Sequence, residues 1–326
     1  MKTMNNNGFR NTMKLILVSG IILLLTLPLF AEGVNNSAGA YMRMGVGARI
    51  IAMGEAGSTI TRDVASAYWN PAGLMMLKDI EFGSMLNFGM NHDRSHKYAA
   101  IAKRFAFGAM AFSWINAGVS DIDGYDDIGN PTGNFSDDEH NISISYANEY
   151  KRLAYGVTPK FYFSSMDGET KAGMGIDVGA KFDVNQYLEA GFMVRDLYGA
   201  YAGDRVPIEL SLGAAAYPII GLTLATDLKW EQAENPYVAF GAEYWTSIGK
   251  DPEADSKLSV ISVREKSTWG DAFSYAQTGI RLGFNQGRFS AGTGIRFRSF
   301  QLDYVYRLNN HDIFSDDHII SMILRF

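Results

Sequence analysis

Apolar and polar residues alternate along most of the chain after residue 79. Residues 222–230 show the pattern most clearly, with large apolar side chains on one face and small, polar or charged ones on the other. The apolar positions are Leu222, Leu224, Leu228 and Trp230, and the alternate positions are Thr223, Ala225, Asp227 and Lys229. Residues 174–182 and 188–195 repeat the pattern. A period of two residues is that of a β-strand, so the sequence predicts a chain built from strands.

About fourteen such stretches are present, each near the ~10 residues that a tilted membrane-spanning strand needs. They lie at residues 80–90, 97–103, 106–116, 140–150, 153–164, 172–183, 187–195, 206–217, 220–230, 236–246, 276–284, 288–297, 300–308 and 317–326. Short connections alternate with longer polar ones at residues 117–139, 165–171, 196–205 and 309–316. Outer-membrane barrels have short periplasmic turns at one rim and longer loops at the other.

The predicted fold is therefore an all-β transmembrane antiparallel β-barrel of about 14 strands, in the outer membrane of a Gram-negative-type bacterium. Its expected partner is outer-membrane lipid. Two connections depart from the alternation of turns and loops. Residues 285–287 are short at the long-loop rim, and residues 247–275 are long at the short-turn rim, so the pattern leaves the local strand register there open.

The polar face of the predicted strands carries charges of both signs, which the barrel would place in its lumen. The candidate lumen charges are Asp177, Lys181, Asp227, Lys229, Arg281, Arg296 and Asp303, together with Glu189, Arg195, Glu209, Glu243 and Arg307. A lysine or arginine facing lipid at the midplane would cost roughly 2–4 kcal/mol, which supports the inward assignment. The mixed signs predict internal ion pairs. A selective polar channel is the alternative, although one dominant sign is then expected.

The two ends of the chain agree with export to an outer membrane. Residues 1–31 combine Lys2, Arg10 and Lys14 with an apolar run of about 16 residues, which predicts a signal peptide. A single anchoring helix is the alternative, although the run is short of the ~20 residues that such a helix needs. At the other end, an alternating strand finishes on Phe326, which resembles the signal that bacterial barrel-assembly machinery recognises.

Composition narrows the class of protein further. The 326 residues include 34 glycines and no cysteine, and the formal net charge is −6. A disulfide or a thiol nucleophile is therefore excluded. With a sequence pI of about 5.4 and no basic block, no nucleic-acid partner is expected. The mean hydropathy of −0.07 argues against a bundle of membrane helices and suits a β-barrel.

Two motifs precede the predicted strands. Residues 45–56 read GVGARIIAMGEA, and residues 63–74 read DVASAYWNPAGL. This pair resembles the PorV/PorQ family of outer-membrane proteins, whose members open with similar stretches. The resemblance extends in character over most of the mature chain. It implies a FadL-like barrel of about fourteen strands with an N-terminal segment packed inside it. Residues 247–275 are longer than the turn that the resemblance implies there and are interpreted as an insertion.

The chain is accordingly divided into a signal peptide (1–31), an N-terminal plug or hatch segment (32–79) and an outer-membrane β-barrel (80–326). The glycines of the segment allow close packing and unusual backbone angles. A first strand with a periplasmic linker is the alternative. The candidate plug-motif residues are Gly47, Arg49, Gly54, Tyr68, Trp69, Asn70 and Pro71.

The function follows mainly from the resemblance. It implies a role in protein export or surface attachment of the type IX secretion kind, with secretion components or cargo proteins docking on loops 117–139 and 196–205. The alternative is a FadL-like transporter of a small hydrophobic molecule, with an apolar pocket beside the plug. That pocket would be lined by Met42, Met44, Met53, Met75, Met76 and Trp69. A purely structural outer-membrane protein is a third hypothesis.

No enzyme activity, cofactor or metal is expected. His92 and His96 lack a third ligand and are interpreted as residues of a solvated loop. Four aspartates, Asp121, Asp123, Asp126 and Asp127, lack the glycine position of an EF-hand and are interpreted as an acidic outer loop, with loose calcium binding as the alternative. The sequence contains no G-x-S-x-G, H-E-x-x-H or P-loop motif.

Overall fold

The computed structural model describes residues 39–88, 90–91, 93–248, 276–309 and 315–326. The predicted signal peptide and almost all of the predicted insertion at 247–275 lie outside the described residues. Within the described ranges, no helix has both the length and the apolar character needed to cross a membrane.

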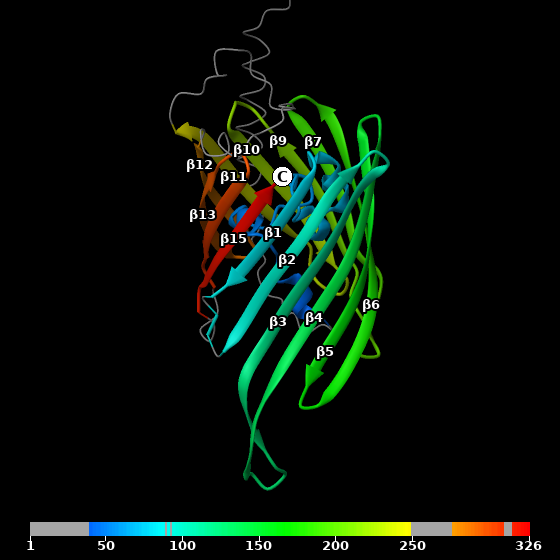
Figure 1. The fold of residues 1–326 in the computed structure, drawn as a ribbon, viewed down its shortest axis with the longest axis vertical. Coiled ribbons are helices and arrows are strands. Elements are labelled where there is room, and N and C mark those ends of the chain that lie inside the picture. Colours follow the sequence, from blue (N-terminus) through cyan, green and yellow to red (C-terminus); the bar gives the residue numbers. More distant parts are fainter. Residues whose placement is uncertain (1–38, 89, 92, 249–275, 310–314) are drawn as a thin grey trace, which may run out of the picture.

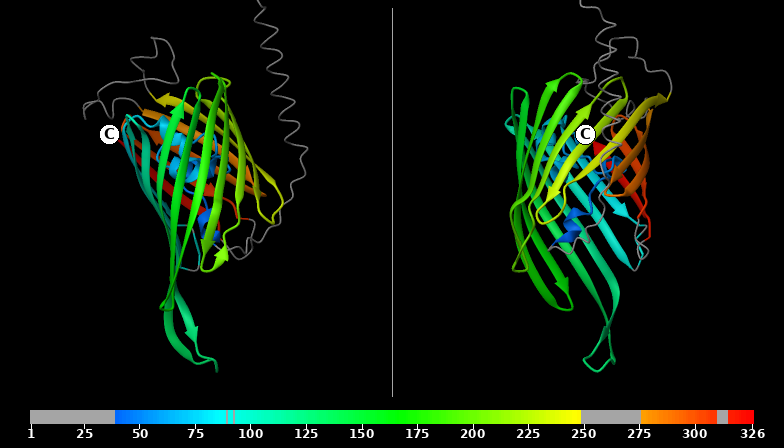
Figure 2. Two further views of the ribbon diagram at one scale, coloured as in Figure 1. Left: turned by 90° about the vertical axis from the view of Figure 1, so that its right-hand side faces the viewer. Right: turned by 180° about the vertical axis from the view of Figure 1, so that it is seen from behind.

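The described strands form one antiparallel sheet that closes on itself (Figures 1 and 2). Fourteen strands make up the ring: β1 (Ile80–Asn87), β2 (Arg94–Phe105), β3 (Gly108–Tyr125), β4 (Pro131–Tyr150), β5 (Leu153–Met166), β6 (Glu169–Asn185), β7 (Leu188–Tyr201), β9 (Glu209–Ala216), β10 (Leu222–Glu231), β11 (Tyr237–Ile248), β12 (Ala276–Asn285), β13 (Arg288–Arg296), β14 (Phe300–Arg307) and β15 (Asp317–Arg325). The two-residue strand β8 (Asp204–Arg205) pairs antiparallel with the end of β7, with Ala200 opposite Arg205. Strand β1 pairs with β15, from Glu81 opposite Arg325 to Asn87 opposite Ile319. The predicted fourteen-stranded antiparallel barrel is confirmed.

Three segments predicted as loops are largely strand instead. Strands β3 and β4 continue as a paired ribbon as far as Tyr125 and Pro131, so that most of residues 117–139 forms a long hairpin projecting from the barrel (Figure 1). Residues 165–171 and 196–205 likewise extend β5, β6 and β7. The prediction fails there because a strand that extends beyond the membrane has water on both faces. Its sequence then shows no alternation of apolar and polar residues, although the backbone hydrogen bonds between the strands continue.

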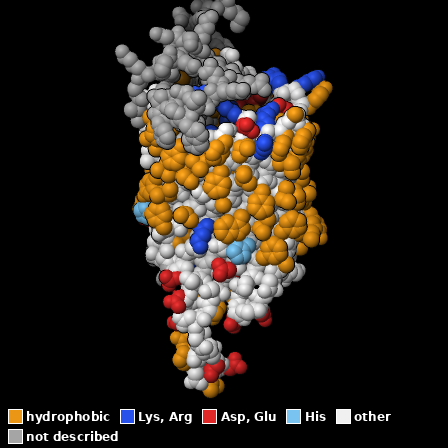
Figure 3. Space-filling view, in the orientation of Figure 1, with side chains coloured by type: hydrophobic (Ala, Val, Ile, Leu, Met, Phe, Trp, Pro, Cys, Tyr) orange, Lys and Arg blue, Asp and Glu red, His pale blue; other side chains and the backbone are white. Residues whose placement is uncertain are grey.

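The outer surface of the barrel is apolar. On β10, the Leu228 and Trp230 side chains are 48% and 42% exposed, whereas Asp227 and Lys229 between them are 1% and 2% exposed. A band of hydrophobic side chains crosses the face of the barrel that Figure 3 shows. Apolar side chains outside and charged side chains inside are typical of a membrane barrel, whereas a soluble sandwich has the opposite arrangement.

Residues 39–79, here called the inner segment, lie within the barrel (Figure 2). They form four short helices: η1 (Ala40–Arg43), α2 (Ala48–Ala52), α3 (Ser66–Trp69) and η2 (Pro71–Met76). The main hydrophobic core lies between this segment and the inward face of the wall. It includes Ile50, Ile51, Trp69 and Leu74, each at most 2% exposed.

Strand β7 departs from regular pairing halfway along its length. Ile176 pairs with Tyr198, but Val178 pairs with Val194, so β7 holds two more residues than β6 between these pairs. Asp196 lies in this bulge with a φ of 51°. Bulges re-aim side chains, and here the Asp196 carboxylate is buried toward the lumen.

Candidate functional site

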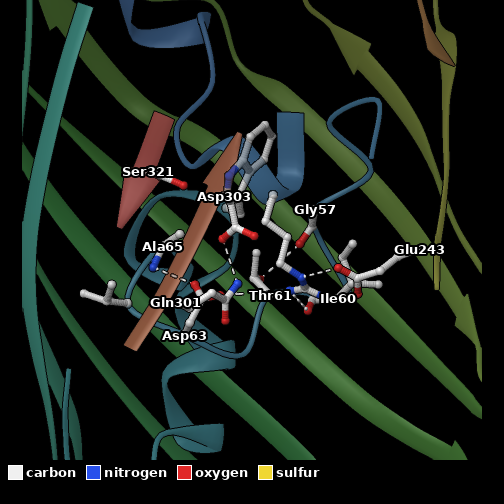
Figure 4. Close-up of polar contacts among 12 residues, drawn as sticks. Gly57, Ile60, Thr61, Asp63, Ala65, Glu243, Gln301, Asp303 and Ser321 are labelled. Carbon is white, nitrogen blue, oxygen red and sulfur yellow. Dashed lines mark hydrogen bonds and ion pairs between the residues drawn. The ribbon is translucent and has the colours of Figure 1, made fainter. Parts of the chain in front are cut away.

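The candidate site is the lumen, where the inner segment is attached to the wall by ion pairs. Arg49 on α2 lies against Glu243 of β11, with its Nε and Nη2 donating to the two carboxylate oxygens at 2.8 and 2.7 Å. The Nε of Arg281 on β12 donates to the same carboxylate at 2.7 Å. Figure 4 shows Glu243 together with Asp63 of the segment and Asp303 of β14. Burial alone would lower the pKa of Arg49, but Glu243 raises it well above its ordinary value.

A second attachment lies nearer the long-loop end of the lumen. Arg43, the last residue of η1, contacts Glu209 at 3.0 Å, Glu231 at 3.3 Å and Asp196 at 3.6 Å. These three carboxylates belong to three different wall strands. Burial would lower the pKa of Arg43, yet Glu209 and its neighbours raise it, so this guanidinium stays charged.

Other polar contacts complete the attachment around the barrel. Glu55 accepts hydrogen bonds from Arg307 and Asn285, both at 2.8 Å. The backbone N–H and the hydroxyl of Ser58 donate to Asp227 at 2.9 and 2.8 Å. Arg62 pairs with Glu189. The segment is therefore held by charged or polar side chains of many wall strands.

The wall is lined with glycine where the backbone of the segment approaches it. Three pairs of glycines face each other across neighbouring strands: Gly156 and Gly179, Gly191 and Gly213, and Gly241 and Gly283. A Cβ at Gly241 would lie 2.3 Å from the Met53 carbonyl oxygen, and one at Gly283 would lie 2.0 Å from the Gly54 nitrogen. These distances are far below van der Waals contact, so only glycine permits this approach.

The predicted plug-motif residues form the interior of the segment and its contacts with the wall. Gly47 and Gly54 have φ angles of 78° and 63°, which glycine adopts readily. The Trp69 Nε1 donates to the Val46 carbonyl at 2.8 Å. Burial raises the pKa of Tyr68 to about 12, and its hydroxyl donates to the Met42 carbonyl at 2.8 Å.

Asn70 joins the segment to two wall strands. Its Nδ2 donates to the carbonyls of Ser58, Ala180 and Phe192 at 2.7, 3.1 and 3.3 Å. Its Oδ1 accepts from the Ala72 N–H, which caps η2, and Pro71 is the first residue of that helix. Proline is favoured at this position because its missing N–H is not needed there.

The candidate lumen charges all have inward positions. Asp177, Lys181, Asp227, Lys229, Arg281 and Asp303 are at most 5% exposed, and Arg296 is half-buried. Lys160 bridges Asp177 and Asp196 at 2.6 and 2.7 Å. Arg281 lies 2.8 Å from Asp303. Arg296 instead donates to Gln277 and lies over the Trp245 ring, 4.3 Å from its centroid.

A separate apolar cluster lies where η1 faces the long-loop end of the lumen. The Tyr201 ring contacts those of Tyr41 and Tyr162 edge to face, with ring centroids 6.3 and 6.0 Å apart. Met42 and Val206 complete it together with Ala117. We call these six residues the mouth cluster. The Tyr41 hydroxyl donates to the His140 carbonyl at 3.0 Å, which fixes the cluster to β4.

The residues predicted to line an apolar pocket are buried or, for Met44 and Met76, half-buried. Met42, Met53, Met75 and Trp69 are at most 5% exposed. A cavity between the segment and the wall, lined by Met42, Asn141 and Lys160 among others, measures about 10 Å³. That is room for about one water molecule, so in this conformation the cavity does not hold a hydrocarbon.

Of the predicted histidine and aspartate candidates, His96 is not a residue of a solvated loop, because it lies on the inward face of β2. His96 is 2% exposed and faces the lumen, Asp93 is exposed, and His92 lies outside the described residues. Asp126 accepts hydrogen bonds from Ile128 and Asn130 within its own hairpin turn. Among the described residues, no group of three metal-ligating side chains is present.

Sequence reasoning missed several residues that attach the segment. Arg43, Glu55, Ser58 and Arg62 were not singled out, and neither were the wall glycines. A signal for the glycines was present, because Gly179, Gly191 and Gly213 fall on the polar face of predicted strands. No local pattern identifies which carboxylate each arginine meets, since the pairs join positions far apart in the chain.

Neither a protein-family model nor a curated protein matches this chain. Solved structures do match it. The Ralstonia pickettii toluene transporter TbuX is 12% identical with a TM-score of 0.55, over 86% of this chain and 98% of that one. The Pseudomonas putida toluene transporter TodX is 11% identical with a TM-score of 0.56 over the same shares. A Pseudomonas aeruginosa FadL homologue is 10% identical with a TM-score of 0.51, over 91% of this chain and 99% of that one.

These likenesses show that the chain has the FadL-like barrel fold. The apolar band on the outside of the barrel is the surface that such a fold presents to lipid. Fold and surface together make the protein an outer-membrane β-barrel.

Proposed function

We propose that the protein is a FadL-like transporter that carries small hydrophobic compounds across the outer membrane. One observation carries the proposal: a closed barrel with an occupied lumen has the fold of two toluene transporters along most of its length. The inner segment acts as the plug. We infer in addition that residues 1–31 are a cleaved signal peptide, and that the protein is not an enzyme.

The lumen itself supports a route that begins at the mouth cluster. Its tyrosine rings and the Met42 side chain are buried together at the long-loop end, so an apolar compound would contact them only once η1 moves. Below this cluster the wall carries closely spaced ion pairs, such as Lys160 with Asp177 and Asp196. Passage of an apolar compound therefore needs the inner segment to move, because desolvated charges do not accommodate hydrocarbon.

Uptake of a radiolabelled monoaromatic hydrocarbon tests the proposal. A strain lacking the gene should take it up more slowly than a strain carrying the gene on a plasmid, and a hydrophilic sugar should enter both equally. A Tyr162→Ala/Tyr201→Ala variant should restore uptake less well than the parent. Equal hydrocarbon uptake with and without the gene would reject transport.

A role in protein export or surface attachment is the second candidate, and the motifs at residues 45–56 and 63–74 favour it by their resemblance to PorV and PorQ. The projecting β3–β4 hairpin would then provide a docking surface. The motif residues also have a packing role inside the barrel, which weakens the inference to secretion. Proteomics of medium, surface and periplasm after gene deletion separates the candidates: a shared set of cargo proteins retained in the periplasm supports export, and unchanged fractions reject it.

A further inference from the structure

The two ends of the barrel differ in charge. At the short-turn end, Lys103 and Arg104 precede the β2–β3 turn, and Lys151 and Arg152 form the β4–β5 turn. We call these four residues the basic rim. The opposite end carries the projecting hairpin with Asp121, Asp123, Asp126 and Asp127, and residues 105–150 contain no lysine or arginine. Figure 3 shows blue side chains with a few red ones among them at the first end, and red side chains along the hairpin at the second.

Three cations of the basic rim lie over aromatic rings. The Lys103 Nζ is 5.4 Å from the centroid of Phe105, and the Lys151 Nζ is 5.2 Å from that of Tyr150. The Arg152 guanidinium is 5.6 Å from the centroid of Phe182. An aromatic ring beside an exposed cation is typical of the depth where apolar chains give way to lipid headgroups.

The rim is also held in place. Arg104 pairs with Glu149 at 2.8 Å, which links the two turns. The Tyr146 hydroxyl and the Asn148 amide donate to the Phe107 carbonyl at 2.8 and 3.1 Å, which adds a second link. The charged side chains of Lys103, Lys151 and Arg152 are exposed on this fixed framework.

We propose that the basic rim binds the phosphate groups of anionic phospholipids in the inner leaflet of the outer membrane. Short turns mark the periplasmic side of such a barrel, so the rim lies next to that leaflet. It is continuous with the apolar band, so a lipid whose chains contact Phe107 or Phe182 has its phosphate near these cations. Complementary charge then favours an anionic headgroup over a zwitterionic one. This inference does not depend on what the barrel transports.

Native mass spectrometry of the full-length barrel tests the proposal. The parent is titrated separately with phosphatidylglycerol and phosphatidylethanolamine. It is compared with a rim variant, Lys103→Gln/Lys151→Gln/Arg152→Gln, and with a control variant, Lys97→Gln/Lys171→Gln/Arg205→Gln. The control removes the same number of exposed positive charges at or near the opposite end. Gel mobility without heating shows that each barrel is folded.

The parent should prefer phosphatidylglycerol, and the rim variant should bind it roughly fivefold more weakly for each charge removed. The control should keep the preference of the parent. Rising salt should weaken phosphatidylglycerol binding by the unmodified parent and leave phosphatidylethanolamine binding unchanged, a measurement that needs no variant. The proposal is overturned if the rim variant keeps the preference, if the control loses as much, or if salt has no selective effect.

Discussion

Arg49 and Glu243, 194 positions apart in the sequence, form a bidentate ion pair in the lumen. Arg49 belongs to the inner segment, and Glu243 belongs to wall strand β11. Because Arg281 donates to the same carboxylate, Glu243 lies between two guanidinium groups. The position of the segment is thus coupled to the ion pairs of the wall, and displacing the segment should disturb these ion pairs.

Arg49→Gln should destabilise the barrel. The change removes the segment's charge from a buried network, and breaking a buried pair costs about 3 kcal/mol or more. Denaturant unfolding in detergent measures the loss. Arg104→Gln is the matched control, because its pair with Glu149 is one-third or more exposed and should cost less than about 1 kcal/mol. Equal losses for the two variants would contradict the assignment of Arg49 as an anchor.

Gly241→Val should displace the inner segment, because its Cβ would lie 2.3 Å from the Met53 carbonyl oxygen. The chain has no cysteine, so Ala56→Cys provides a single reporter at a fully buried position. Maleimide should label this cysteine slowly in the parent background and quickly with Gly241→Val. Ala242→Val is the control, since the next residue of the strand points to the other face. A reporter that stays protected with Gly241→Val would show that the segment tolerates the added side chain.

Alkaline pH should destabilise the barrel partly through Tyr68. Burial, opposed in part by Arg195, raises the pKa of Tyr68 to about 12, against an ordinary value of 10.0. Above pH ~10 the unfolded state loses the phenolic proton and the folded state keeps it. Stability from this group is therefore complete below pH ~10 and falls by about 1.4 kcal/mol per pH unit up to pH ~12.

Tyr68→Phe isolates this effect. The variant loses the hydroxyl contact with Met42, so its stability at neutral pH should be lower. Its slope of unfolding free energy against pH between 10 and 12 should nevertheless be shallower than that of the parent. Parallel slopes would mean that Tyr68 ionises equally easily in the folded and unfolded chains.

The fold was largely predictable because each strand of a barrel wall shows a two-residue alternation of apolar and polar side chains in its own sequence. The stretch at residues 222–230 assigned Leu228 to lipid and Asp227 to the lumen without any knowledge of a partner strand. The long β3–β4 hairpin was not predicted, because beyond the membrane no apolar face marks the strand. The ion-pair partners within the lumen could not be predicted either. The carboxylates that contact Arg43, for example, come from separate strands, and only closure of the barrel brings them together.

Deletion of residues 39–76 should turn the closed barrel into an ion-conducting pore. The wall would then enclose a lumen lined by charged side chains such as Asp177, Lys181 and Asp227, which water would hydrate. In planar bilayers the parent should conduct little, and the deletion variant should conduct well. Shortening the hairpin by removing residues 121–134 is the control, because that ribbon projects away from the lumen.

The sign of the conducted ions adds a sharper test of the same variant. The segment brings Arg43, Arg49 and Arg62 into the lumen against only Glu55 and Asp63, so its removal leaves the wall more negative. Wall carboxylates such as Glu209 and Glu243 would lose their segment partners. The open pore should therefore prefer cations, and the reversal potential in a salt gradient measures that preference. A folded deletion variant that stays closed would mean that the inner segment is not what blocks the barrel. One that opens but prefers anions would mean that its arginines do not balance the charge of the wall.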